Sequence, residues 1–144
     1  MKIGAVGLGN RIAHVYHELS QINKDAELIA YVDPLPIGRE YAEKNNFFPT
    51  KEYSTLNEML SNEKLDLLMI GSPNHLHLEH IKIGLISGVK IFAEKPIVVN
   101  ENQSFELANL LGEFGHDQVL VGLVLRYSQH ARSVRDLINK NVLG

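Results

Sequence analysis

Short apolar runs in this chain alternate with stretches in which apolar residues recur every three or four positions. The runs predict buried strands, and the helical spacing between them predicts connecting helices. We expect strands around Ile3 to Val6 and at 27–32, 47–53, 65–70, 90–93 and 118–125. We expect helices at about 12–21, 37–45, 54–60, 75–87 and 100–114, and a last one of roughly a dozen residues from Ala131 to beyond Ile138.

Several residues mark where these helices begin and end. Ser54 is expected to cap the helix at 54–60, and Asn100 with Gln103 resembles a capping box. Gly88 and Gly115 follow the last apolar positions of their helices and predict C-terminal stops.

Strands that alternate with helices of this length require right-handed crossovers and a parallel sheet. Apolar residues on both faces of 65–70 fit a central strand covered on each side, whereas Pro49 predicts that 47–53 lies at an edge. We therefore predict one α/β domain over residues 1–144: a doubly wound, three-layer Rossmann sheet with strand order 3-2-1-4-5-6.

The first strand leads directly into a glycine turn and a helix, a combination typical of dinucleotide sites. Gly7 and Gly9 allow a phosphate to approach the main-chain N–H groups at the helix N-terminus. About 20 residues on, the strand at 27–32 ends in Asp33, placed to accept both ribose hydroxyls of an adenosine. The third position of the motif is Ile12, where Gly or Ala allows close packing, so the sequence leaves the angle of the helix open.

The composition, 44% apolar and 22% charged over 144 residues, is that of a globular protein. A net charge of −3 without a basic run argues against a nucleic-acid partner, and no apolar stretch is long enough to span a membrane. No cysteine is present, which excludes disulfides and thiolate chemistry. Because Met1 leads straight into the first strand, we expect no export signal and a cytoplasmic location.

Three segments taken together closely resemble the N-terminal half of the Gfo/Idh/MocA family, the oxidoreductases named after glucose-fructose oxidoreductase and inositol dehydrogenase. They are the glycine turn at 7–12, the segment GSPNHLHLEHIKIGLISGVKIFAEKP, and VGLVLRY near the end. The resemblance covers essentially the whole chain. Its most specific matches lie in the loops after the fourth and fifth predicted strands: Ser72-Pro73-Asn74 with His77, and Glu94-Lys95-Pro96.

In that family these loops flank the nicotinamide, and the lysine reaches both cofactor and substrate. The resemblance thus implies that Lys95 is catalytic, and its ammonium suits the stabilisation of alkoxide charge. It also implies a cis peptide bond before Pro96. The residues expected to bind the cofactor are Gly7, Gly9, Asn10, Arg11, Ile12, Asp33, Ser72, Pro73, Asn74, His77, Glu94, Lys95, Pro96 and Arg126.

Some roles have alternatives. Glu94 either forms an ion pair that orients Lys95 or is exposed, and Arg126 either contacts a ligand or pairs with a carboxylate in a domain interface. His75, His77 and His80 lie at the start of one helix but face different directions, so we expect no metal site.

The cofactor indicated is NAD, with NADP less favoured, because Asp33 beside a 2′-phosphate is a like-charge contact. The leading function is an oxidoreductase acting on a sugar, cyclitol or related small-molecule hydroxy metabolite. A nucleotide-sensing regulator would keep the pocket without needing Lys95. A methyltransferase also ends strand two in an acid, but its turn favours G-x-G-x-G, where this chain has Arg11.

Family members carry a second, mostly antiparallel domain, which contributes an aspartate and a histidine to catalysis and mediates oligomerisation. This sequence stops at Gly144, about where that domain begins. We therefore expect a chain that binds a dinucleotide without turning over substrate. The apolar residues Val134, Leu137 and Ile138 of the last helix favour a homo-oligomer.

Overall fold

The computed structural model of the protein describes residues 1–47 and 50–142, and at Tyr127 only the backbone. Pro49, the residue expected to mark an edge strand, lies outside the described residues. No helix in the described part of the chain is both long and apolar enough to cross a membrane.

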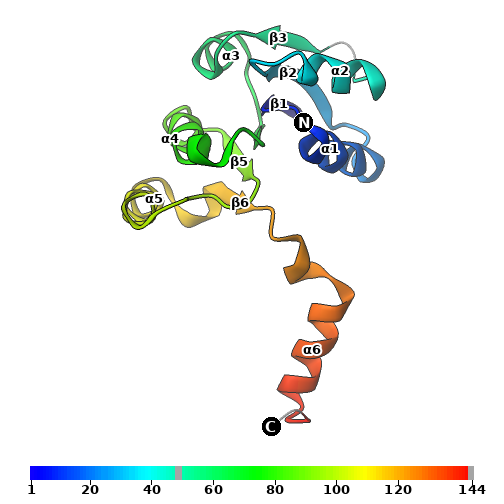
Figure 1. Cartoon of the computed structure of the whole chain (residues 1–144), viewed down its shortest axis with the longest axis vertical. Coiled ribbons are helices and arrows are strands. Elements are labelled where there is room, and N and C mark those ends of the chain that lie inside the picture. Colours follow the sequence, from blue (N-terminus) through cyan, green and yellow to red (C-terminus); the bar gives the residue numbers. More distant parts are fainter. Residues whose placement is uncertain (48–49, 143–144) are drawn as a thin grey trace.

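Six strands form one parallel sheet in the order β3-β2-β1-β4-β5-β6, as predicted (Figure 1). The strands are β1 (Lys2–Val6), β2 (Glu27–Val32), β3 (Lys51–Tyr53), β4 (Leu67–Ile70), β5 (Lys90–Ala93) and β6 (Val119–Val121). The helices are α1 (Asn10–Ile22), α2 (Ile37–Lys44), α3 (Leu56–Asn62), α4 (His77–Ile86), α5 (Glu101–Phe114) and α6 (Gln129–Asn139). The described residues also form three 3-10 turns: η1 (Asn74–Leu76), η2 (His116–Gln118) and η3 (Val124–Tyr127).

The side chains of the central strands divide between two cores, one on each face of the sheet. Ile3 and Ala5 of β1 pack with α1 and α2, whereas Val6 packs with α3, α4 and α5. This alternation follows from the two-residue period of a strand. The result is the predicted three-layer arrangement, visible in Figure 1 as helices on both sides of the sheet.

One predicted helix cap was wrong, and one predicted helix has two parts. Thr55, not Ser54, caps α3, because the Thr55 side chain accepts a hydrogen bond from the Glu58 N–H. The helix predicted over 75–87 is divided into η1 and α4. Asn100 was assigned correctly: its side chain accepts from the N–H of Gln103 at 2.9 Å.

The strand predicted over 118–125 is shorter than expected and ends at Val121. Gly122 still donates its N–H to Ala93, but the chain then turns into η3. Within the described residues β6 lies at the edge of the sheet and pairs with β5 alone, so the continuing segment has no second neighbour there to keep it extended. Of the predicted third strand, residues 51–53 form β3 at the opposite edge of the sheet, beside β2, and residues 48–49 lie outside the described residues.

The last helix, α6, projects away from the sheet (Figure 1). None of its described residues is buried, and its close packing is with η3. Its apolar residues Val134, Leu137 and Ile138 are exposed, as are Leu123 and Leu125 of the segment before it.

Candidate functional site

The loop after β1 is shaped for close approach of a ligand to the main chain. Gly7 has a φ of +78°, and a Cβ on it would lie 2.4 Å from the Ser72 nitrogen, so only glycine fits there. A Cβ on Gly9 would meet nothing within 4 Å. Gly9 precedes α1 without a side-chain cap, so the first N–H groups of this helix face open space.

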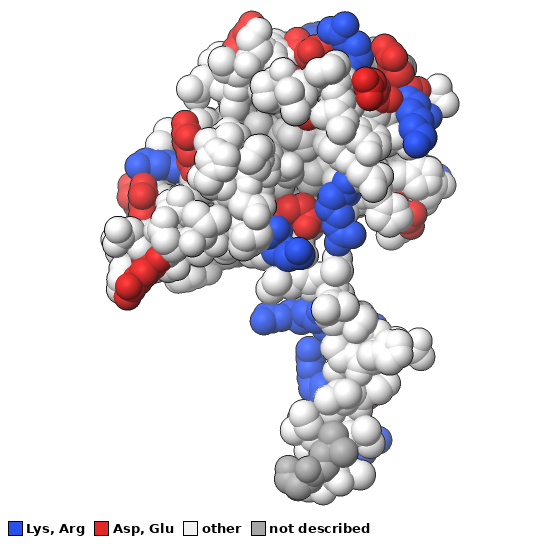
Figure 2. Space-filling view, viewed as in Figure 1, with Lys and Arg blue, Asp and Glu red and all other residues white. Residues whose placement is uncertain are grey.

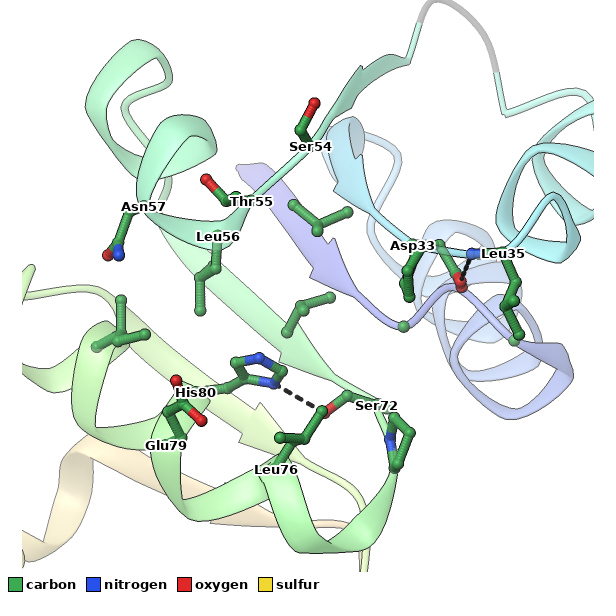
Figure 3. A pocket seen from close by; sticks show the side chains of 18 of the residues that line it. Asp33, Leu35, Ser54, Thr55, Leu56, Asn57, Ser72, Leu76, Glu79 and His80 are labelled. Carbon is green, nitrogen blue, oxygen red and sulfur yellow. Dashed lines mark hydrogen bonds between the residues drawn. The ribbon is translucent and has the colours of Figure 1, made fainter.

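A cleft of about 640 Å³, which we call the Asp33 cleft, opens beside this turn. Gly7 and Gly9 are among its lining residues, and Asp33, at the end of β2, stands at one wall (Figure 3). Oδ1 of Asp33 accepts the N–H of Leu35 at 3.1 Å, which orients the carboxylate. The cleft is mostly apolar, with Leu35, Ile37, Leu56, Leu76 and Ile83 among its lining.

The wall facing Asp33 carries a hydrogen-bonded pair of side chains. Oγ of Ser72, after β4, lies 2.8 Å from Nδ1 of His80 on α4 (Figure 3). Burial is the main cause of a lowered pKa for His80. The negative charge of Glu79 raises this pKa by less, and the nearby His77 lowers it further. His80 is therefore neutral at pH 7 and offers the cleft a polar group without a charge.

A second recess, which we call the Lys95 hollow, has a volume of about 470 Å³ and shares Gly71 and Ser72 with the Asp33 cleft. Its other lining residues are Arg11, Asn74, His77, Glu94, Lys95 and Val124. Figure 2 shows basic and acidic side chains meeting in the recess between the sheet and the projecting C-terminal segment.

Neither alternative predicted for Glu94 is correct. Its side chain is buried, 7% exposed as a residue, and its Oε1 accepts a hydrogen bond from Nε of Arg11 at 3.0 Å. Successive residues of an extended loop point to opposite sides, so Glu94 turns inward toward α1 while Lys95 is exposed. Glu94 thus anchors Arg11 and leaves Lys95 facing the hollow.

His77 links the two loops expected to flank the nicotinamide. Its Nε2 lies 2.7 Å from the carbonyl oxygen of Ser72, and its Nδ1 lies 2.7 Å from that of Pro96. A carbonyl oxygen only accepts, so a ring nitrogen that carries a proton donates to it. The bond between Lys95 and Pro96 is cis, as the resemblance implied. His77 therefore contacts both loops through its two ring nitrogens.

Four of the residues expected to bind the cofactor lie outside both recesses. Asn10 is exposed on α1, and Ile12 is buried in the core against Gly71. Pro96 contributes its carbonyl oxygen to His77, and Arg126 lines a separate, largely apolar hollow of about 320 Å³ with Lys95 and Val124. The other expected residues line the Asp33 cleft or the Lys95 hollow: Gly7, Gly9, Arg11, Asp33, Ser72, Pro73, Asn74, His77, Glu94 and Lys95.

Sequence reasoning missed one wall of the Asp33 cleft. Leu76, His80 and Ile83 form a half-buried stripe along η1 and α4, next to the fully buried stripe of Leu78, Ile81 and Leu85. Their spacing of four and three residues was the available signal. A second, largely apolar stripe beside the stripe that packs in the core indicates that another face of the helix lines a cleft.

A parallel sheet in this order, with an open glycine turn before a helix and an acid at the end of the second strand, defines a Rossmann-type dinucleotide-binding protein. The family model GFO_IDH_MocA, described as the oxidoreductase family with an NAD-binding Rossmann fold, matches residues 1–123. The chain belongs to this family, which excludes the methyltransferase alternative.

Individual relatives agree with this assignment. An uncharacterized oxidoreductase of Streptococcus pneumoniae is 27% identical over 144 residues, all of this chain and 38% of that protein. Myo-inositol 2-dehydrogenase from Lactobacillus plantarum has a TM-score of 0.88 at 22% identity, over 100% of this chain and 42% of that one. Scyllo-inositol dehydrogenase from Lactobacillus casei, solved with NAD(H) and scyllo-inositol, has a TM-score of 0.84 at 24% identity, with coverage of 100% and 42%.

At these identities the two solved structures establish a common fold. The chain spans about two fifths of the length of these relatives, 38% to 42%.

Proposed function

We propose that this chain is the cofactor-binding part of an NAD-dependent oxidoreductase. It would move a hydride between nicotinamide and a carbinol carbon of a sugar, cyclitol or related hydroxy metabolite. One observation carries the proposal: the Asp33 cleft and the Lys95 hollow meet at Gly71 and Ser72, on either side of the glycine turn. Two recesses that adjoin at these shared residues suit the two halves of a dinucleotide.

The residues fit the cofactor by their chemistry. Asp33 would accept the ribose hydroxyls, and the open space at Gly9 with the uncapped N–H groups of α1 would hold the pyrophosphate. The apolar lining of the Asp33 cleft would cover the adenine, with Ser72 and His80 at its edge. The nicotinamide, when bound, supplies the group that accepts or gives the hydride.

Lys95 is the proposed catalytic residue. Lys95 lines the hollow with Asn74 and with the ion pair between the exposed Arg11 and the buried Glu94. A positive charge beside a hydroxyl that is being oxidised stabilises the alkoxide as it forms, and one beside a carbonyl polarises it for reduction. His77 and the Arg11–Glu94 pair would hold the two loops in place around this charge.

We propose NAD in preference to NADP, because Asp33 would repel a 2′-phosphate. Calorimetric titration of the chain is expected to give NADP binding about tenfold or more weaker than NAD binding. Asp33→Asn should weaken NAD and remove most of this discrimination. Asp117→Asn, which removes an exposed charge paired with Lys90, is the matched control and should change neither.

Two results would contradict this proposal. Absence of measurable binding of either dinucleotide would remove the cofactor assignment, and equal affinity for NADP would remove the role of Asp33 in selection.

We also infer self-association of the chain through the apolar residues exposed on η3 and α6. Leu123, Val124 and Leu125 adjoin the helix that exposes Val134 and Ile138. A contiguous apolar patch of this kind is a frequent site of protein–protein contact.

A further inference from the structure

A third recess lies on the outer side of Asp33, beyond the Asp33 cleft. We call it the Arg39 hollow: it has a volume of about 590 Å³ and is lined by Asp33, Pro34, Arg39, Glu52, Tyr53 and Ser54. Asp33, Pro34 and Ser54 also line the Asp33 cleft, so the two recesses adjoin at the carboxylate. A group attached to a ribose hydroxyl held by Asp33 would extend into the Arg39 hollow.

Arg39 is close to Asp33 because of how α2 packs. A Cβ on Gly38 would lie 2.6 Å from Cβ of Asp33, so the first turn of α2 rests against this residue. Arg39 follows Gly38 directly and carries the one positive charge among the residues that line the hollow in the described structure. A guanidinium at this place is suited to bind a phosphate.

Glu52 holds that guanidinium. Nε of Arg39 donates to Oε2 of Glu52 at 3.1 Å, and Nη2 donates to the same oxygen at 2.5 Å. A third donor, the hydroxyl of Tyr31, lies 3.1 Å from this oxygen. Tyr31 is a buried residue of β2 and the register partner of Glu52 on β3, so the carboxylate is tied to the sheet.

The charges of the hollow follow from this contact. The hydrogen bond from Arg39 is the main cause of a lowered pKa for the Glu52 carboxyl, which therefore stays ionised at neutral pH. Asp33 and Glu52 together place two carboxylates around one guanidinium. A 2′-phosphate entering the hollow would meet net negative charge and a guanidinium that already donates from Nε and Nη2 to Glu52.

We propose that Glu52 is a cofactor-selectivity residue: it engages Arg39 and so withholds from NADP the one cation placed to bind a 2′-phosphate. This inference rests on the proposed function, in which Asp33 holds the adenosine ribose. Selection against NADP then has two parts, direct repulsion by Asp33 and the occupation of Arg39 by Glu52. Arg39 and Glu52 are 63% and 39% exposed in their side chains, so Glu52→Gln can exchange the charge without disturbing the core.

The test is calorimetric titration of NAD and NADP into the chain and three variants, each checked for an unchanged unfolding midpoint. Glu52→Gln is expected to tighten NADP binding about tenfold and to leave NAD binding within about twofold. The double variant, Glu52→Gln with Arg39→Ala, should bind NADP without this increase in affinity. Glu106→Gln makes the same charge change in an exposed pair with Lys82 and should leave both affinities unaltered.

Three outcomes would overturn the inference. NADP affinity of Glu52→Gln within about twofold of the unmodified chain would mean that Glu52 does not control Arg39. A gain that survives Arg39→Ala would mean that another cation binds the phosphate. Failure of the unmodified chain to bind NAD would overturn the proposed function together with this inference, whereas tight NAD binding without the NADP gain would overturn the inference alone.

Discussion

At the contact between Ile12 and Gly71, the large residue is on the helix and the small residue follows the strand, the reverse of a usual glycine turn. The third position of the motif ordinarily holds a small residue so that the helix can approach the strand. Here Ile12 is 1% exposed, and a Cβ on Gly71 would lie 2.3 Å from its Cγ1. The small residue that allows close packing is therefore on the strand side of the contact. Gly71 therefore lets α1 approach β4 closely although the third position of the motif is Ile12.

The two positions should be energetically coupled. Gly71→Ala is expected to destabilise the chain by about 2 kcal/mol through overpacking, and Ile12→Ala by about 3 kcal/mol through a cavity. The double variant should lose at least about 1 kcal/mol less than the sum, because the new methyl group occupies space that Ile12 vacates. Coupling remains partial, since the same Cβ would also lie 2.9 Å from the Gly7 carbonyl oxygen. Urea unfolding of the unmodified chain, the two single variants and the double variant measures this coupling. Additive changes in the free energy of unfolding would show that the clash with the Gly7 carbonyl oxygen dominates.

Lys95→Ala separates an enzyme from a nucleotide sensor. In a protein that carries this domain and turns over substrate, kcat should fall about 100-fold or more, because a charge acting only in the transition state is lost. NAD affinity of the chain should stay within about threefold, because the side chain is exposed and lies away from the Asp33 cleft. Lys90→Ala, at the other end of β5, is the control. Near-normal turnover would remove the catalytic assignment and favour the regulator.

Strands and helices were predictable from the sequence where the local apolar pattern matches the burial of the segment in the folded protein. β2 and β5 match the predicted ranges because the apolar runs at 27–32 and 90–93 are enclosed by neighbours on both sides. The run at 118–125 has the same composition but lies at an edge, so its second half follows η3 instead. Thr55 and Ser54 are equivalent as caps, and the choice between them depends on the end of β3, which the sequence does not reveal.

The candidate site was predictable as a set of strand ends, because parallel strands bring those ends to one edge. The pairings within it were not. Arg11 and Glu94 are 83 residues apart in sequence, and their contact depends on the position of α1 over β5. The control of Arg39 by Glu52 likewise depends on the register of β2 and β3. Long-range pairings of this kind need the tertiary structure.

At the scale of the whole molecule, stability and self-association should be separable. A chain ending at Tyr127 lacks α6, which has no buried residue in the described structure, so its unfolding midpoint should remain within about 2 °C. The same deletion removes Val134 and Ile138, so concentration-dependent association in analytical ultracentrifugation should decrease. Leu120→Ala, on exposed β6, keeps α6 and serves as the control. A large loss of stability would mean that α6 packs on the sheet in solution.

The order of strands in the sheet also affects how the chain is made. β1 is synthesised before its neighbour β4, yet it lies in the middle of the sheet, with Ile3 paired to Leu67 of β4. One hydrogen-bonding edge of β1 therefore stays open until β4 has been synthesised, while β2 and β3 can already form on its other side. An apolar strand with an open edge can pair with other chains. Between the synthesis of Val6 and that of Ile70, the nascent chain thus carries an apolar strand with an open edge that can pair with another chain.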